Sequence, residues 1–354
     1  MIERLSNQID DQMDRMSIKV TSKFKENDLE EFVKNSLNGN IFQTPDMAKV
    51  YERSRKNSPI TLVAIDEDED MILSSLVAKL STKKKGILSS FSTYSTIRGG
   101  PVFRDTSESI ASISPLLESY IEIAKKKAIF SNIYPLNDPS SIVETLRRFG
   151  FNYSVWNNFL IDLSKPKEEL WRNLKRDKRR AIKKAKKHGV KITEGTKDEL
   201  SIFYDLVLER QRMRRNPFED RNFFEGVFDI LVPKGRAKFL FAKYKDEYIA
   251  TRLILLYNGT IHAWYVGSDL RYRKYYPNDL LVWHVLEWGS KSGFHTFDFG
   301  GAGESHQLNE GWVQFKSRFG GKLVNYGRYT KIHHEKKWWI VKNMYGIYRR
   351  IFIR

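Results

Sequence analysis

Asp298 is the acidic residue that the sequence places best for chemistry. It lies in a predicted strand at 296–299 and is followed by Gly300 and Gly301, which let a ligand approach the backbone closely. A carboxylate at such a turn can orient an amine or accept its proton. It can equally cap the turn through its own hydrogen bonds, so both roles stay open.

Other familiar catalytic machinery is missing from the sequence. The chain contains no cysteine, which excludes disulfides, thiolate metal sites and cysteine nucleophiles. It has no Gly-x-Ser-x-Gly turn, and its seven histidines show no metal-ligand spacing beyond the adjacent pair His333 and His334. That pair falls in a charged segment and is expected at the solvated surface. We therefore predict no metal site.

The positive charge of the chain is concentrated in two segments. Residues 172–187 hold ten Lys and Arg against Asp177 alone, and residues 318–354 hold ten against Glu335 alone. Each segment therefore carries +9, and together they account for the whole net charge of +18. Such density predicts a polyanionic partner, although two solvated helices without a partner would have the same composition.

The first basic segment is predicted to be one helix with two different faces. Ser164 and Pro166 suit its start, and Gly189 ends it. Its apolar residues recur at helical spacing and leave the basic residues on the remaining surface. The predicted contacts with the polyanion are Lys183, Lys184, Lys186 and Lys187. The second segment ends in 338–354, a mixture of aromatic and basic residues that suits either a membrane interface or a terminal helix packed on the protein.

One order of elements occurs twice along the chain. In each half, two helices precede three strands, and a helix, a strand, a short helix and a last strand follow. This order predicts an α/β protein with mixed sheets, in two tandem domains with a cleft between them. The first half is expected to have helices at 29–37, 45–53, 109–127 and 140–149 and strands at 60–65, 71–80, 87–94, 129–134 and 151–163. The second half is expected to have helices at 198–212, 222–231, 278–292 and 311–319 and strands at 237–243, 248–257, 261–268, 296–299 and 322–329.

This order resembles the GNAT acyltransferase fold, and two motifs sharpen the resemblance. The sequence Asp-Phe-Gly-Gly at 298–301, followed by Gly-Trp-Val-Gln-Phe-Lys-Ser-Arg-Phe-Gly-Gly at 311–321, resembles the signature of the FemABX family. Members of that family transfer amino acids from aminoacyl-tRNA to peptidoglycan precursors. Residues 40–45, 98–101 and 182–190 support the resemblance, which spans about 28–331. The coiled-coil arm of some members is missing, so the acceptor stays open.

The resemblance implies roles for several residues. Lys316 matches the Phe-Lys pair of the signature and is predicted to stabilise an oxyanion, with Asp298 as the second catalytic residue. Phe315 either stacks on the terminal base of the tRNA or packs in the core. Arg98, next to Gly99, Gly100 and Pro101, is predicted to line an acceptor site. Arg214 and Arg215 are predicted to grip the phosphates of a nucleotide- or lipid-linked acceptor, or to end a helix.

The loop before the helix at 278–292 indicates which acyl donor the protein uses. A CoA-dependent acyltransferase needs a glycine-rich turn there to hold the pyrophosphate, and residues 271–280 contain no glycine. We therefore predict no bound cofactor, with aminoacyl-tRNA as co-substrate and a cell-envelope precursor as acceptor. Two alternatives stay open: a CoA-dependent N-acyltransferase acting on a sugar or peptide amine, and a non-catalytic nucleic-acid-binding protein.

Domain limits and a location can also be predicted. The predicted domains are 1–163, on the acceptor side, and 164–331, with the basic helix and the signature, followed by a tail at 332–354. No apolar stretch has the length of a membrane span, and the first residues lack the apolar region of a signal peptide. The expected location is therefore cytoplasmic, with the tail able to touch the inner face of the membrane.

Overall fold

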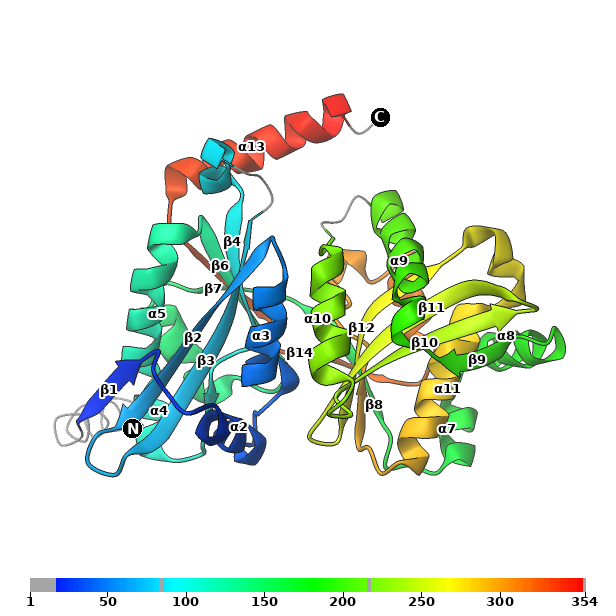
Figure 1. Ribbon diagram of the computed structural model, residues 1–354, viewed down its shortest axis with the longest axis horizontal. Coiled ribbons are helices and arrows are strands. Elements are labelled where there is room, and N and C mark those ends of the chain that lie inside the picture. The colour runs from blue at the N-terminus through cyan, green and yellow to red at the C-terminus, as the bar shows by residue number, and fades with distance from the viewer. Residues whose placement is uncertain (1–16, 83–85, 215–217, 353–354) are drawn as a thin grey trace. The chain divides into compact units, whose positions relative to one another are not determined.

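The computed structural model describes residues 17–82, 86–214 and 218–352 and divides the chain into two compact units (Figure 1). The first unit combines Met1–Ser154 with Tyr326–Arg354, and the second is Val155–Asn325. Each unit has one mixed sheet with helices on its faces, so the chain has the predicted mixed α/β fold.

The first unit is built on a sheet in which β4 and β6 run parallel and the other pairs are antiparallel. In spatial order its strands are β1 (Ile18–Thr21), β2 (Asn57–Asp66), β3 (Met71–Thr82), β4 (Thr93–Gly99), β6 (Phe130–Pro135), β15 (Arg328–Ile332) and β7 (Asn152–Ser154), with β5 (Val102–Phe103) beside β3. Its helices are α2 (Glu26–Asn35), α3 (Pro45–Arg53), α4 (Ser107–Ala111), α5 (Ile113–Lys127), α6 (Val143–Arg148) and α13 (Glu335–Phe352).

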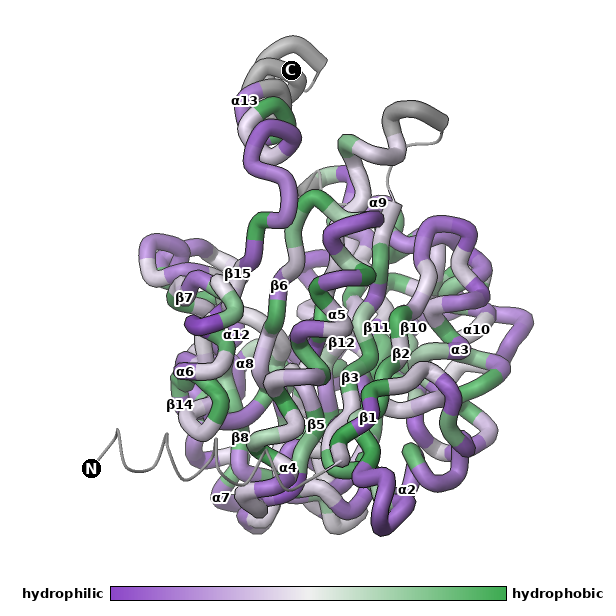
Figure 2. Tube along the Cα trace, turned by 90° about the vertical axis from the view of Figure 1, so that its left-hand side faces the viewer, coloured by the Kyte–Doolittle hydropathy of each residue, from purple (hydrophilic) through white to green (hydrophobic). Residues whose placement is uncertain are grey.

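The core of the first unit lies between its sheet and α5. Leu116, Leu117 and Tyr120 of α5 are fully buried against apolar residues of β2, β3 and β4. On the other side of the sheet, α3 begins as the sequence predicts, because Thr44 caps it and Pro45 occupies its first turn. Figure 2 shows that the strands are mostly hydrophobic and that the outer helix α2 is mostly hydrophilic.

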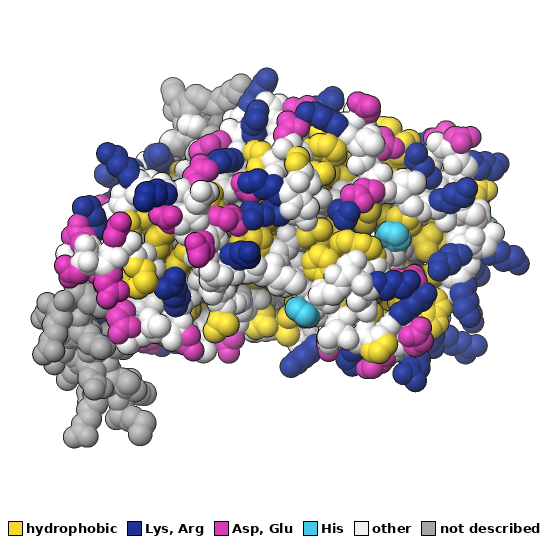
Figure 3. Space-filling view, turned by 60° about the horizontal axis from the view of Figure 1, so that its bottom comes forward, with side chains coloured by type: hydrophobic (Ala, Val, Ile, Leu, Met, Phe, Trp, Pro, Cys, Tyr) yellow, Lys and Arg dark blue, Asp and Glu magenta, His cyan; other side chains and the backbone are white. Residues whose placement is uncertain are grey.

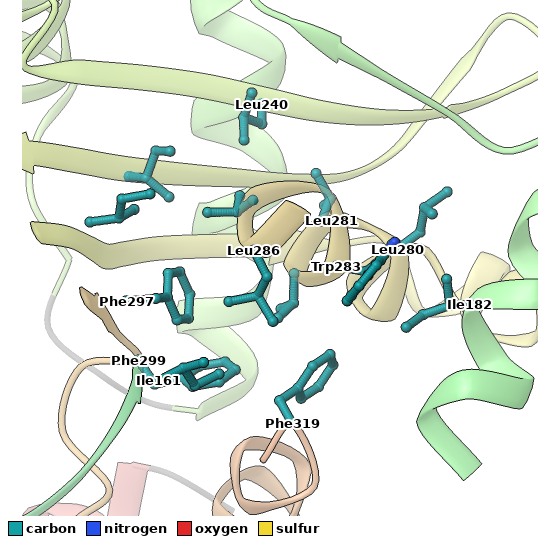
Figure 4. Packing of buried hydrophobic residues seen from close by; sticks show 14 of the residues in the cluster. Ile161, Ile182, Leu240, Leu280, Leu281, Trp283, Leu286, Phe297, Phe299 and Phe319 are labelled. Atoms are coloured by element: carbon teal, nitrogen blue, oxygen red, sulfur yellow. The ribbon is translucent and has the colours of Figure 1, made fainter. Parts of the chain in front are cut away.

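The second unit has a comparable sheet with two groups of helices. In spatial order its strands are β14 (Lys322–Asn325), β8 (Asn157–Asp162), β13 (Thr296–Asp298), β12 (Thr260–Ser268), β11 (Glu247–Tyr257), β10 (Ala237–Tyr244) and β9 (Lys191–Glu194). Its helices are α7 (Lys167–Asn173), α8 (Arg176–Lys187), α9 (Leu200–Arg214), α10 (Arg221–Leu231), α11 (Pro277–Lys291) and α12 (Gly311–Ser317). Figure 4 shows side chains of α11 meeting those of β13 and of Phe319, which follows α12.

The last predicted strand of each half is divided between the two sheets. The segment predicted at 151–163 forms β7, in the sheet of the first unit, and β8, which pairs with β13 and β14 in the second. The segment predicted at 322–329 forms β14 in the second unit and β15 in the first. The units therefore divide at 154/155 and 325/326 rather than at 163/164 and 331/332, because backbone pairing carries each strand into the other sheet. The predicted cleft between them stays a prediction.

Other elements also differ from the sequence prediction. The predicted strand at 87–94 is a short 3₁₀ segment (Gly86–Phe91), and the strand itself begins at Thr93, where alternate residues are buried. The single basic helix is interrupted at Leu174 and Lys175, which have extended backbone and separate α7 from α8. Gly189, with a φ of 80°, follows the end of α8 as expected.

Candidate functional site

Lys316 holds the loop that follows β13. Its ammonium donates hydrogen bonds of 2.9 Å to each of the carbonyl oxygens of Phe299, Gly300 and Gly301. An ammonium has three protons, so this set uses all of them. Gly300 has a φ of 71°, a conformation that favours glycine. The two halves of the signature are therefore in direct contact, and an oxyanion would have to displace one carbonyl to reach the ammonium.

Asp298 lies in a buried polar network where β8, β12 and β13 meet. It is 2% exposed, and one carboxylate oxygen accepts 2.6 Å hydrogen bonds from the Asn158 side chain and the Gly300 N–H. The other oxygen lies 3.2 Å from Nδ1 of His262. Burial alone would raise the pKa of Asp298, but the hydrogen bonds from His262, Asn158 and Gly300 outweigh it and lower the pKa. The geometry fits a carboxylate that positions the loop, because a buried, weakly basic group is poorly suited to take a proton.

Phe315 is a half-buried aromatic residue of α12. Its ring centroid is 5.1 Å from that of Phe319, and Nζ of Lys178 lies 3.9 Å from the centroid of Phe315. Lys178 also donates a 2.8 Å hydrogen bond to Asp279, and both side chains are about nine-tenths buried. The ring therefore packs against the core and against Lys178. Its stacking on a nucleotide base stays a prediction.

The basic helix α8 has two faces, as its spacing predicts. Ala181, Ile182 and Ala185 are buried against the core of the second unit. The four lysines predicted to contact a polyanion are exposed and form no ion pair with a described residue; they are Lys183, Lys184, Lys186 and Lys187. Figure 3 shows Lys and Arg side chains gathered at the end of the second unit. The resulting surface carries concentrated, unneutralised positive charge.

The amino end of α11 is occupied by protein groups. Tyr276 precedes the helix with a φ of 55°, and Pro277, the first helical residue, has no N–H to offer a phosphate. Asp279, two residues further on, places a carboxylate in the first turn. Burial raises the pKa of Asp279, with Lys178 acting in the opposite direction. This turn therefore offers one backbone N–H fewer to a phosphate and contains a carboxyl group paired with Lys178.

Arg98 belongs to a separate cluster in the first unit. Its guanidinium lies 5.2 Å from the ring centroid of Phe42 and 5.9 Å from that of Tyr134, and its carbonyl accepts a hydrogen bond from Gln43. A Cβ at Gly99 would lie 2.2 Å from the Asn40 side chain, so the motifs at 40–45 and 98–101 need this glycine to pack together. The structure therefore brings both motifs into one cluster around the half-buried Arg98, and the role of its guanidinium in binding an acceptor stays a prediction.

Other predicted residues lie at the ends of elements. Arg214 ends α9, and Arg215 lies outside the described residues. In the tail, Trp338 packs edge-on against Phe130, whereas Trp339 is 67% exposed. Contact of the tail with a membrane stays a prediction. Within the described residues, no helix is both long and apolar enough to cross a bilayer.

His333 is a correction to the sequence analysis. It is half-buried rather than solvated, because Nε2 lies 2.7 Å from the hydroxyl of Ser131, which in turn hydrogen-bonds Tyr120. Burial lowers the pKa of His333 to about 4, with smaller contributions from the charges of Lys331 and His334. Among the described residues, no group of three or more His, Asp and Glu side chains is arranged to hold a metal ion.

Three residues of the second unit were not singled out from the sequence. Asn158 and His262 complete the network around Asp298, and Lys178 is the member of the basic run that pairs with Asp279. Lys178 lies on the same helical face as Ala181, Ile182 and Ala185, which is the signal that could have identified it as buried.

Comparisons with known proteins bear on the fold. Residues 172–312 match the family model described as the acetyltransferase (GNAT) domain. FemX is 17% identical over 89% of this chain and 97% of its own, with a TM-score of 0.68. L-PGS from Bacillus licheniformis is 13% identical; the match covers 90% of this chain and 96% of that protein, with a TM-score of 0.56. A tandem GNAT protein from the clavulanic acid biosynthesis pathway is 11% identical; the match covers 90% of this chain and 99% of that protein, with a TM-score of 0.55. No curated protein matches the sequence.

These likenesses extend over both units, whereas the family model matches only part of the second. At such low identity they establish the fold and leave the reaction open. They agree with the two mixed sheets and the repeated order of elements. The chain therefore has a tandem GNAT fold.

Proposed function

We propose that this protein is an acyltransferase that moves an aminoacyl group from aminoacyl-tRNA to an amine on a cell-envelope precursor. The observation that carries the proposal is the exposed face of α8, where Lys183, Lys184, Lys186 and Lys187 have no carboxylate partner among the described residues. Folded nucleic acid is the partner that such a row of lysines attracts best, because each neutralised phosphate releases condensed counterions. The fold supplies the acyltransferase half of the proposal.

The chemistry that remains for the protein is limited. The ester of an aminoacyl-tRNA is already activated, so the enzyme has to align ester and amine and stabilise the oxyanion that develops. We assign Lys316 and Asp298 to the loop 298–301 as positioning residues, since their polar atoms are engaged with that loop. The charge of Lys316 also favours an oxyanion nearby, and exchange of one carbonyl for the substrate oxygen would bring the two into direct contact.

The chemical class of the acceptor is inferred from arginine residues. Arg98, near the rings of Phe42 and Tyr134 in the first unit, suits an anionic group of the acceptor. We propose that this group is a phosphate or carboxylate of a nucleotide- or lipid-linked precursor, in line with the resemblance to the FemABX family. Arg214 at the end of α9 is a second candidate for the same role.

A CoA-dependent N-acyltransferase is the second candidate, favoured by the match of residues 172–312 to an acetyltransferase domain. The amino end of α11 opposes it, because Pro277 lacks an N–H at a turn where backbone N–H groups would have to hold a pyrophosphate, and because the carboxyl group of Asp279, paired with Lys178, lies in that turn.

One assay separates the two donors. The protein is incubated with aminoacyl-tRNAs labelled in the amino acid, or with labelled acetyl-CoA, together with nucleotide-linked peptidoglycan precursors as amine acceptors. We expect label to move from aminoacyl-tRNA only. The matched control is the variant in which Lys183, Lys184, Lys186 and Lys187 are all replaced by Glu, which should no longer transfer from tRNA. Transfer from acetyl-CoA alone would establish the second candidate and refute the first.

A further inference from the structure

Arg252, in the middle of β11, is buried without a counter-charge. It is 5% exposed, and its Nε has no hydrogen-bond partner. No carboxylate of a described residue forms an ion pair with it. Arginine is almost never fully buried unless it is paired, because removing a charge from water is costly. The Nε of this buried guanidinium could therefore bind an anion that is not part of the chain.

The surroundings of Arg252 increase this imbalance. Its cross-strand neighbours are Leu240 of β10 and Val266 of β12, and Leu240 belongs to the apolar core beneath α11. Directly opposed residues share a sheet face, so Arg252 lies on that apolar face. Burial lowers the pKa of Arg252 to about 10, and the positive charge of Arg210 on α9 acts in the same direction. The electrostatic influence of a second guanidinium thus adds to the cost of burying the first.

The position along the sheet suits a ligand. The strand β13 pairs only with Thr260–His262 of β12 and ends at Asp298, whereas β12 continues to Ser268. Val266, the neighbour of Arg252, lies beyond the end of β13. The register between β11 and β12 also shifts between Leu253 and Ile254, one residue beyond Arg252. Arg252 therefore lies in the part of the sheet where β12 continues beyond the end of β13. The loop held by Lys316 begins at that end of β13.

We propose that Arg252 is the receptor for a phosphate group of the acceptor substrate. A guanidinium presents paired N–H donors that match the oxygens of a phosphate. A bound phosphate would supply both the missing counter-charge and the missing acceptor for Nε. That the phosphate belongs to an acceptor rests on the proposed function; the anion site itself rests only on the surroundings of Arg252.

The test measures thermal unfolding against the concentration of inorganic pyrophosphate, at constant ionic strength set with chloride. We expect the melting temperature of the protein to rise with pyrophosphate. Arg252→Met should raise the half-saturating concentration at least about tenfold, the effect expected for one charge-assisted hydrogen bond. Arg252→Lys keeps the positive charge but loses the paired N–H donors of the guanidinium, so its half-saturating concentration should lie between those of the unaltered protein and Arg252→Met. Arg221→Gln, at an exposed arginine paired with Glu225, is the matched control and should behave as the unaltered protein.

Two further readouts decide the assignment. Without ligand, Arg252→Met should melt at the same temperature or higher, because it removes an unpaired buried charge; a clear decrease would mean that Arg252 is a structural residue and would overturn the proposal. Uridine diphosphate and a short-chain phosphatidic acid, used as separate arms, distinguish a nucleotide-linked from a lipid-linked phosphate. If none of the three anions stabilises the protein, the anion site is refuted. No arm contains tRNA, so failure of the aminoacyl-transfer assay does not affect this result.

Discussion

At the scale of single residues, the signature of this chain is a set of groups that bind one another. The ammonium of Lys316 donates to three successive carbonyls, and Asp298 accepts from the N–H of Gly300 within the same loop. Preorganised donors and dipoles at a reacting centre lower its activation free energy without rearrangement during the reaction. The lysine and the aspartate therefore contribute to chemistry by fixing a loop.

Replacing Lys316 by Met tests this view. The variant keeps most of the side-chain length but leaves three carbonyls without their donor. We expect turnover to fall on the order of 10²–10³-fold, by analogy with loss of one oxyanion donor. We also expect the free energy of unfolding to fall by roughly 2 kcal/mol, the range for hydrogen bonds to a charged group. Transfer assays and urea titrations measure the two effects.

Lys322→Met is the matched control, since Lys322 is exposed on β14 and shares the local charge. It should change neither quantity. Equal losses at both positions would indicate general electrostatics, and an unchanged turnover in Lys316→Met would remove Lys316 from the mechanism.

At the scale of elements, α8 separates two kinds of lysine on one helix. Lys178 faces inward, donates to Asp279 of α11 and packs on the ring of Phe315, so it joins three elements of the second unit. The lysines that follow at 183, 184, 186 and 187 face solvent. The inward face fixes the helix, and the outward face is left for a partner.

Reversing the charges of the exposed lysines of α8 tests whether this helix binds tRNA. With Lys183, Lys184, Lys186 and Lys187 all replaced by Glu, affinity for tRNA should fall strongly. The slope of log affinity against log salt should decrease by roughly 0.7–0.9 for each phosphate that the helix no longer neutralises. Filter binding or fluorescence anisotropy across a salt titration measures both quantities. The control reverses Lys125, Lys126 and Lys127, three exposed lysines at the end of α5. The idea fails if affinity is unchanged, or if the control has an equal effect.

At the scale of the whole molecule, the chain passes between its two units twice. The strand β8 lies between β13 and β14 in the sheet of the second unit, and β15 lies between β6 and β7 in the sheet of the first. Each sheet is therefore completed by a strand that the sequence pattern had assigned to the other domain. Neither predicted domain contains all of its own sheet.

Two fragments of similar length test this division. Residues 155–325 contain the complete second sheet and should unfold cooperatively in urea. Residues 164–331 lack β8, whose Phe159 and Ile161 are buried in the core. Removing those two side chains costs roughly 5–10 kcal/mol, comparable with the whole stability of a domain, so this fragment should not fold. Cooperative unfolding of 164–331 would contradict the pairing of β8 with β13 and β14.

The sequence by itself determined the order of the main helices and strands and the two faces of the basic helix. Helix α3 occupies the predicted residues, and α11 and β11 lie within one residue of prediction at each end, because hydrophobic period and capping residues are local properties. It also placed Phe315, Lys316 and Asp298 in one signature through the resemblance to a family. Their hydrogen bonds were not predictable, since they join residues through side-chain geometry.

Only the tertiary structure decided which sheet each last strand joins, that Lys178 is buried within a basic run, and that Arg252 lies unpaired in an apolar strand. His333 belongs to the same class, because Ser131, its hydrogen-bond partner, lies about two hundred residues away along the chain. The physical reason is common to all four cases. Local sequence fixes the backbone period, whereas strand partners, burial of charge and the pKa of a side chain depend on contacts between residues far apart in sequence.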